Sequence, residues 1–312
     1  MTLRITSLHP LFGVEVLDVQ VTRVDEATFK EIVHAFNEHS VLLFRDQRLT
    51  DKEQVEFSRR FGPLEVTIRS IASQDDTLPQ ISNLANVDAD DQLIPAGDRR
   101  NLYNAANQMW HTDSSFKQVP ALASLLSGRE VPPEGGETQF ASMRVAYERL
   151  PEEMKRALEG KVAIHSFAYS RGLIGGDLLP PEHAVQVPPV YQALVRVNPV
   201  NGRMSFYVAS HACEIVGMRT DEARALLREL RELATQPELV YTHRWKPWDL
   251  VMWDNRCTLH RGRPWNESRY RRVMHRTTVA GDGPTATSDA PPHVSPAREV
   301  DITWGRAQLE MI

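Results

Sequence analysis

The chain has 312 residues, of which 41% are hydrophobic and 25% charged, and its formal net charge is -5 at pH 7. This length is ample for a large buried core, and it leaves open whether the chain forms one large β domain or two smaller domains. The composition is that of a globular protein, and the absence of a basic surplus argues against a nucleic-acid partner. No apolar run approaches the roughly 20 residues of a membrane span, and the N-terminus has no signal-peptide core. We therefore expect a cytoplasmic protein without a membrane partner.

The first third of the sequence predicts two helices around a buried strand, followed by a long loop. Apolar residues recur at helical spacing in residues 25–39, and residues 41–44 form a short apolar run typical of a buried strand. Thr50 and Glu53 have the spacing of a capping box, so a second helix is predicted after them. Residues 69–101 show no sustained period, which favours a long loop of the kind that often covers a binding site.

His111 and Asp113 are separated by a single residue. If this segment is an extended strand, residues i and i+2 point to the same side and can present an imidazole and a carboxylate to one ion. Such a pair also occurs by chance, so it does not establish a metal site alone.

The middle of the chain predicts further helices, a second loop and a hairpin. Helical spacing recurs within residues 142–160, while residues 170–192 are rich in Gly and Pro. Two strand-like runs within residues 194–208 indicate a hairpin. Thr220 is expected to cap a helix with one apolar stripe.

Strand-like runs return within residues 239–245, 250–253 and 272–279. Because strands lie at both ends of the sequence with helices inserted between them, we expect a mostly antiparallel sandwich or barrel. Arg272 and Arg276 fall on one face of the last strand. The pattern leaves open whether this face lines a cavity or is solvated.

His260, just after the apolar strand at residues 250–253, supplies a possible third metal ligand. Together with His111 and Asp113 it would form a set of two histidines and one carboxylate. Three ligands on one face leave the opposite face of an octahedral ion open, as in non-haem Fe(II) oxygenases. Asp254 is expected to accept hydrogen bonds in a turn rather than to be a fourth ligand. Cys213 and Cys257 lack metal or disulfide spacing and are expected to be buried thiols.

Four segments together resemble the taurine dioxygenase family of Fe(II)- and 2-oxoglutarate-dependent oxygenases. They are Trp110–Asp113, Gly135–Thr138, Trp253–Asn255 with His260, and Arg271–Arg276. The resemblance extends from about Leu8 to Val279. Within the family, the sequence is most similar to the 2,4-dichlorophenoxyacetate dioxygenases, as judged from Leu8–Phe12, Asn107–His111 and Leu250–Cys257.

This resemblance implies a mainly β fold with inserted helices, a double-stranded β-helix (jelly roll, cupin-like), as a single domain over residues 1–281. Residues 282–312 then form a polar tail, which we expect to pack loosely or to join an oligomer contact. The implied Fe(II) ligands are His111, Asp113 and His260. Thr138 and Arg272 would bind the distal carboxylate of 2-oxoglutarate, Arg276 the anionic group of the substrate, and Asn107 would lie on the substrate side.

One departure from the family pattern concerns the arginines. The segment between His260 and the arginine pair is about one residue longer than in taurine dioxygenase, so Arg271 would be the anchor by distance. Arg272 is the anchor by motif, because it keeps the spacing to Arg276, and we choose it.

The implied reaction consumes 2-oxoglutarate and O2 and hydroxylates a small anionic substrate. An aryloxyalkanoate such as 2,4-dichlorophenoxyacetate would yield a phenol, glyoxylate, succinate and CO2. A taurine, alkylsulfonate or alkyl sulfate dioxygenase would keep the same ligands, whereas a cupin-like metal isomerase would have no use for Thr138 and Arg272. A binding module without catalysis would leave the metal ligands unexplained. We also expect a homo-oligomer.

Overall fold

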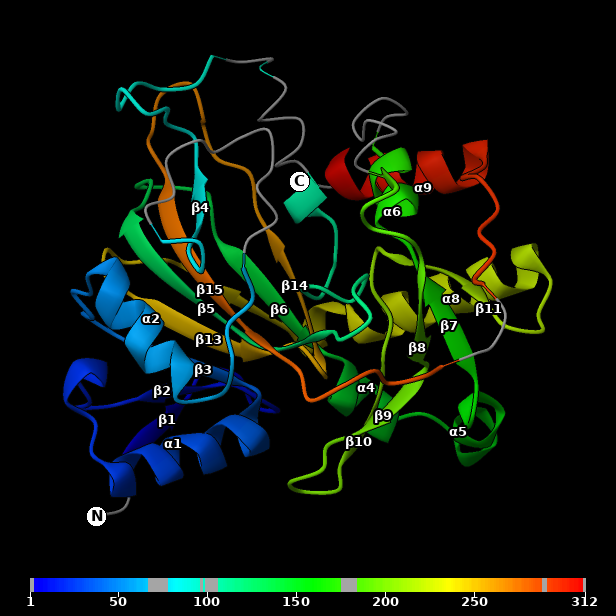
Figure 1. Ribbon diagram of the computed structural model, residues 1–312, viewed down its shortest axis with the longest axis horizontal. Coiled ribbons are helices and arrows are strands. Elements are labelled where there is room, and N and C mark those ends of the chain that lie inside the picture. Colours follow the sequence, from blue (N-terminus) through cyan, green and yellow to red (C-terminus); the bar gives the residue numbers. More distant parts are fainter. Residues whose placement is uncertain are drawn as a thin grey trace.

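The computed structural model describes residues 3–66, 78–95, 98, 106–174, 184–287 and 291–310. Its largest sheet has the strand order β1-β2-β3-β13-β5-β15-β4 (Figure 1). These strands are β1 (Ile5–Ser7), β2 (Val14–Val16), β3 (Val41–Phe44), β13 (Leu250–Asp254), β5 (Ala121–Glu130), β15 (Val273–Ala280) and β4 (Ser82–Ala85). β2 and β3 are parallel, and all other neighbours in this sheet are antiparallel. The sheet is thus mostly antiparallel, as the sequence predicted.

A second sheet faces the first and completes the sandwich. It has the order β12-β6-β14, formed by β12 (Val240–His243), β6 (Thr138–Ser142) and β14 (Thr258–Gly262). Phe140 of β6 packs on Trp253 of β13, with ring centroids 5.5 Å apart, and Met274 of β15 joins this core. The first four residues of β13 are apolar because both faces of this strand are buried. Val251 and Trp253 face the second sheet, while the alternate residues Leu250 and Met252 face helices.

Helices α1 (Glu26–His39) and α2 (Asp51–Arg59) cover the outer face of the large sheet (Figure 1). Asp25 caps α1 by accepting a hydrogen bond from the backbone N of Thr28. The predicted capping box of α2 is confirmed, since Thr50 and Glu53 each accept from the other's backbone N–H.

The remaining elements pack beside the sandwich. A small sheet has the order β11-β7-β8, and β9 and β10 form the predicted hairpin. Their bounds are β7 (Val162–His165), β8 (Val190–Ala193), β9 (Val195–Val197), β10 (Met204–Phe206) and β11 (Ala212–Ile215). The helices here are α4 (Met143–Glu148), α5 (Glu152–Leu158), α6 (Phe167–Gly172) and α8 (Thr220–Ala234). Short 3-10 turns lie at Ala106–Gln108, at Pro237–Leu239 and, next to α2, at Val21–Arg23. Thr220 is the first residue of α8 and not its cap, which is Arg219.

The two predicted loops differ from the structure in part. β4 lies inside the first of them and pairs with β15, with Met274 opposite Leu84. This strand has no signal in the sequence, because none of its four residues, Ser82–Ala85, is β-branched or aromatic. The second loop begins inside α6 and ends in β8. Residues 69–77, 96, 97 and 99–101 of the first predicted loop and residues 175–183 of the second lie outside the described residues.

The C-terminal tail does not pack loosely as expected. Helix α9 (Glu299–Glu310) lies beside α6 (Figure 1), where an added Cβ on Gly305 would be 2.8 Å from the carbonyl oxygen of Leu173. Asp301 is only 2% exposed and accepts from Arg224 of α8 at 2.6 Å. The expectation of loose packing is wrong because Asp301 has charged partners far away in sequence, whereas the expected oligomer contact stays a prediction. No helix in the described ranges is both long and apolar enough to cross a membrane.

Candidate metal centre and active site

His111 and His260 are held side by side by backbone hydrogen bonds. The N–H of His111 donates to the carbonyl of His260 at 3.0 Å, and the N–H of His260 donates back at 2.8 Å. Their ring centroids are 4.1 Å apart. His260 lies on β14, but His111 forms only an isolated bridge and Asp113 lies in a turn, so the predicted strand for the pair of His111 and Asp113 is wrong. The turn continues into Ser114, whose φ is 54°.

Asp113 completes a buried cluster that can bind a metal ion. One ligand atom from each of His111, Asp113 and His260 lies within 4.8 Å of the others, and all three residues are buried. The Nε2 atoms of His111 and His260 lie 4.0 Å and 3.7 Å from the Asp113 oxygens. Two imidazoles and one carboxylate form a ligand set that suits Fe(II).

The protonation of the cluster also suits a metal. His111 Nδ1 lies 2.8 Å from the carbonyl oxygen of Met109, which can only accept, so Nδ1 bears the proton and Nε2 keeps its lone pair. Burial lowers the pKa of His111 and lowers the pKa of His260 further, which favours neutral imidazoles. Burial alone would raise the pKa of Asp113, but Arg276, His260 and His111 outweigh it and hold that pKa below its usual range.

A second polar region contains Thr138 and Arg272. Arg272 is 9% exposed and donates from Nε to the carbonyl oxygen of Gly136 at 3.2 Å. Burial lowers the pKa of Arg272 to about 10, so it remains charged at neutral pH. Among the described residues, no carboxylate lies within ion-pair distance of it. Thr138 is buried at the start of β6, and its hydroxyl oxygen accepts from Trp245 Nε1 at 3.0 Å.

Arg276 lies on the inner face of β15, and Arg272 directly precedes this strand, with the fully buried Met274 between the two arginines in sequence. The question that the sequence left open is thus answered, because this face is turned to the interior of the sandwich. Arg276 Nη1 donates to Asp113 Oδ1 at 2.6 Å, while its buried Nε has no partner among the described residues. Asn107 lies in the 3-10 turn before the cluster, with its carbonyl oxygen 3.8 Å from a Cβ built on Gly262 of β14.

Sequence reasoning missed Ser124, Asn255 and Trp245 as parts of this region. Ser124 Oγ donates to Asp113 Oδ2 at 2.7 Å, and Asn255 Nδ2 donates to Ser124 at 2.9 Å. No spacing rule connects these residues to the metal cluster, because each comes from a different segment. Ser124 lies on β5, Trp245 follows β12 and Asn255 follows β13. Asn255 lies in a segment that carries the family resemblance, but its contact with the backbone of Asp113 is tertiary.

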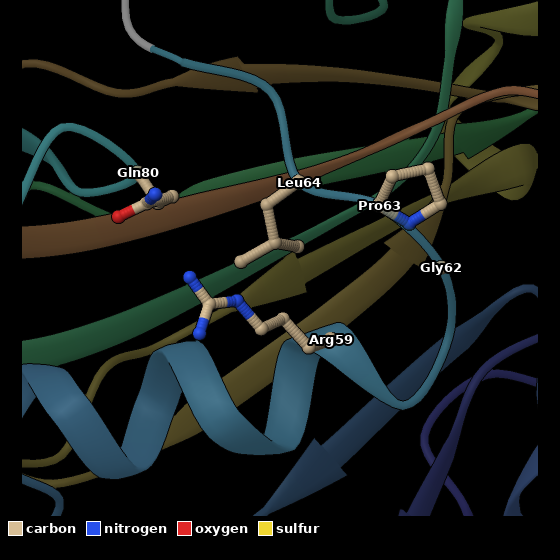
Figure 2. A pocket seen from close by; sticks show the side chains of 5 residues that line it. All are labelled: Arg59, Gly62, Pro63, Leu64 and Gln80. Atoms are coloured by element: carbon tan, nitrogen blue, oxygen red, sulfur yellow. The ribbon is translucent and has the colours of Figure 1, made fainter.

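A surface groove lies near this region but contains none of the predicted site residues. Figure 2 shows its lining, which comes from the end of α2, the turn after it and the segment before β4: Arg59, Gly62, Pro63, Leu64 and Gln80. Its volume is about 560 Å³. The adjoining Glu65 accepts from Ser114 Oγ at 2.7 Å, so the groove wall is connected to the turn that bears Asp113.

A jelly-roll sandwich that buries two histidines and one carboxylate defines the class of mononuclear non-haem metal oxygenases. Residues 4–278 match the family described as "Taurine catabolism dioxygenase TauD, TfdA family", and the chain belongs to it.

Individual relatives cover nearly the whole chain. It is 41% identical over 275 residues to the alpha-ketoglutarate-dependent 2,4-dichlorophenoxyacetate dioxygenase of Cupriavidus pinatubonensis, covering 87% of this chain and 96% of that protein. It is 35% identical to the (S)-phenoxypropionate/alpha-ketoglutarate-dioxygenase of Sphingobium herbicidovorans, covering 91% of this chain and 97% of that protein. The solved structure of AAD-2 in complex with Mn(II) and N-oxalylglycine matches with a TM-score of 0.84 and 41% identity, covering 92% of this chain and all 100% of that one.

The chain is therefore a 2-oxoglutarate-dependent dioxygenase that uses iron, 2-oxoglutarate and O2. The predicted family, jelly-roll fold, enzyme class and cofactors are confirmed. The family membership and the enzyme class exclude the cupin-like isomerase and the binding module without catalysis.

Proposed function

We propose that this dioxygenase hydroxylates a small anionic substrate, an aryloxyalkanoate such as 2,4-dichlorophenoxyacetate, and that His111, Asp113 and His260 bind its Fe(II). The observation that carries the proposal is a buried three-ligand cluster next to two arginines, Arg276 on the inner face of β15 and Arg272 directly before this strand. The names of the relatives support the choice of an aryloxyalkanoate.

Arg272 and Thr138 are proposed to bind the distal carboxylate of 2-oxoglutarate. A buried guanidinium without a carboxylate partner is costly, and a dicarboxylate cosubstrate would offset that cost through paired charge-assisted hydrogen bonds. The Thr138 oxygen already accepts from Trp245, so its own hydrogen is available to donate to the cosubstrate.

Arg276 is proposed to bind the anionic group of the substrate, with Asn107 nearby. In the structure its partner is Asp113. Since Asp113 belongs to the proposed ligand set, its charge is committed to the metal in the loaded enzyme. Arg276 then needs another anion, and the substrate carboxylate is suited to this position.

Bound iron supplies the redox chemistry, in which O2 oxidatively decarboxylates 2-oxoglutarate to succinate and CO2 and the second oxygen atom enters a C–H bond of the substrate. Hydroxylation of an aryloxyacetate beside its ether oxygen gives a hemiacetal, which collapses to a phenol and glyoxylate. The protein contributes by positioning the reactants. Arg272 and Thr138 fix one end of the cosubstrate, and Arg276 fixes the substrate anion. The burial of the cluster excludes water.

The first test is succinate formation across aryloxyacetates, alkylsulfonates and alkyl sulfates. We expect turnover that needs Fe(II), 2-oxoglutarate and O2 together, with release of a phenol from the aryloxyacetates. Replacing His111, Asp113 or His260 with Ala should abolish turnover and leave the fold intact. A preference for alkyl sulfates or sulfonates would instead assign the alternative substrate class. An Asp113→Ala enzyme with a normal rate would refute the ligand assignment.

The second test is Arg276→Gln, which keeps polarity but removes the charge. Binding of anionic substrates should weaken at least about tenfold, or roughly 1.4 kcal/mol, whereas a neutral ester should lose little. Affinity for 2-oxoglutarate is measured separately from the visible absorption of its Fe(II) chelate. A loss confined to 2-oxoglutarate would remove Arg276 from the substrate site.

We further propose a single domain over residues 1–281 with the tail docked upon it, a homo-oligomer and a cytoplasmic location. The burial of Asp301 against α8 supports the docking. Size-exclusion chromatography with light scattering tests the oligomer.

A further inference from the structure

Asn255 connects three segments around the metal cluster. It follows β13 and is fully buried. Its Oδ1 accepts from the backbone N of Asp113 at 3.1 Å and from Trp253 Nε1 at 2.9 Å. Its Nδ2 donates to Ser124 Oγ at 2.9 Å, and Ser124 is also fully buried, on β5.

The direction of every hydrogen bond in this group is fixed. Two N–H donors face one end of the Asn255 amide, so that end is the oxygen and the other end is the NH2. Ser124 Oγ therefore accepts from Asn255, and its own hydrogen is left for Asp113 Oδ2, 2.7 Å away. A charged carboxylate can only accept, so the Ser124 hydroxyl cannot reverse.

We propose that Ser124 and Asn255 are positioning residues that set the orientation of the Asp113 carboxylate and thereby the affinity of the metal centre. This inference rests on the proposed role of Asp113 as a metal ligand. The two oxygens of Asp113 have different partners: Ser124 binds Oδ2, whereas Arg276 binds Oδ1 at 2.6 Å. Without Ser124 the carboxylate is free to rotate toward Arg276, and the metal must then reorient it at a cost in binding.

The experiment measures divalent metal binding to the metal-free protein, using Co(II) followed by its visible absorption and Fe(II) by anaerobic calorimetry. Ser124→Ala should bind either metal about 10- to 100-fold more weakly than wild type, the range typical for loss of a hydrogen bond to a metal ligand. Ser127→Ala is the matched control. Ser127 lies on the same strand and is equally buried, but its Oγ has no hydrogen-bond partner among the described residues. The metal affinity of the Ser127→Ala protein should stay within about twofold of that of wild type.

Ser124→Thr keeps the hydroxyl and should restore most of the affinity, a result that a purely structural role of the small side chain does not predict. If Ser124→Ala does not fold, Asn255→Ala tests the same chain of hydrogen bonds from its other end and should also weaken metal binding. Equal metal affinity in wild type and Ser124→Ala overturns the inference. No metal binding by wild type, or unchanged binding in His111→Ala, refutes the proposed metal centre instead, so the two failures are distinguishable.

Discussion

Two adjacent arginines have opposite environments. Arg271 is ion-paired with Asp91 and Glu130 at the surface, whereas Arg272 is buried against Gly136 without a carboxylate partner. Both residues directly precede β15, and only Arg272 turns its side chain into the interior. This geometry supports the choice of Arg272 by motif over Arg271 by distance.

Arg272→Ala should therefore raise the 2-oxoglutarate requirement strongly. Loss of one partner of a buried charge pair costs about 2 to 5 kcal/mol, which is roughly 30-fold to several thousand-fold in affinity. Arg271→Ala is the control and should bind the cosubstrate almost as wild type does, as measured from the visible band of the Fe(II) chelate. The opposite ranking would mean that Arg271 is the anchor.

Trp245→Phe should weaken 2-oxoglutarate binding more modestly. The change keeps an aromatic ring but removes the N–H that faces Thr138 Oγ1 at 3.0 Å, so the hydroxyl can turn away from the cosubstrate. Loss of one such hydrogen bond costs about 1 kcal/mol, or roughly fivefold. Pyruvate lacks the distal carboxylate and serves as the control cosubstrate. An equal loss with pyruvate would show that Trp245 does not act through Thr138.

At the scale of elements, the turn before β6 shapes the proposed cosubstrate site. Gly136 has a φ of 68°, and a Cβ there would lie 2.9 Å from Pro132 and 3.2 Å from the Cδ and Nε atoms of Arg272. Glycine is thus required both for the backbone conformation and for the approach of Arg272.

Gly136→Ala should displace Arg272 and weaken 2-oxoglutarate binding in addition to straining the turn. Gly160→Ala separates the two effects, because Gly160 has a similar φ of 69° with nothing within 4 Å of an added Cβ. Both variants should lose about 1 to 3 kcal/mol of unfolding free energy from backbone strain. Only Gly136→Ala should bind 2-oxoglutarate more weakly. Similar cosubstrate affinities in both variants would contradict this role.

On the scale of the whole molecule, the C-terminal helix is attached through buried charge. Asp301 accepts from Arg224 and Arg228 of α8 and from the backbone N of Arg298. Arg224 is itself 3% exposed and also pairs with Glu214. The attachment therefore depends on satisfied ion pairs as well as on apolar packing.

Asp301→Ala should lower the unfolding free energy by about 3 kcal/mol or more, because it leaves a buried guanidinium with one carboxylate fewer. Urea denaturation measures the loss. Asp221→Ala is the control, since it breaks only an exposed pair with Arg219 and should leave the denaturation midpoint unchanged. An Asp301→Ala protein as stable as the control would mean that α9 contributes little to the fold.

The sequence by itself determined the features that depend on local spacing and on motifs. The helices of residues 25–39 and 142–160, the capping box at Thr50 and the antiparallel strands follow from period and composition, because each side chain's face is set by its own backbone. The family resemblance then pointed to His111, Asp113 and His260, which the structure brings together.

Only the tertiary structure decided which face of β15 lines the space between the two sheets, where the tail docks and what holds Asp113. The period of a strand is symmetric between its two faces, so it could not assign the side of Arg272 and Arg276. The turn at Asp113 and the contacts of Ser124 and Asn255 come from three segments that meet in space. Asn255 lies 142 positions from Asp113 and 131 positions from Ser124, and hydrogen bonds over such separations leave no pattern in the local sequence. Ser124 and Asp113 are only 11 positions apart, but they lie in different elements that meet only when the chain folds.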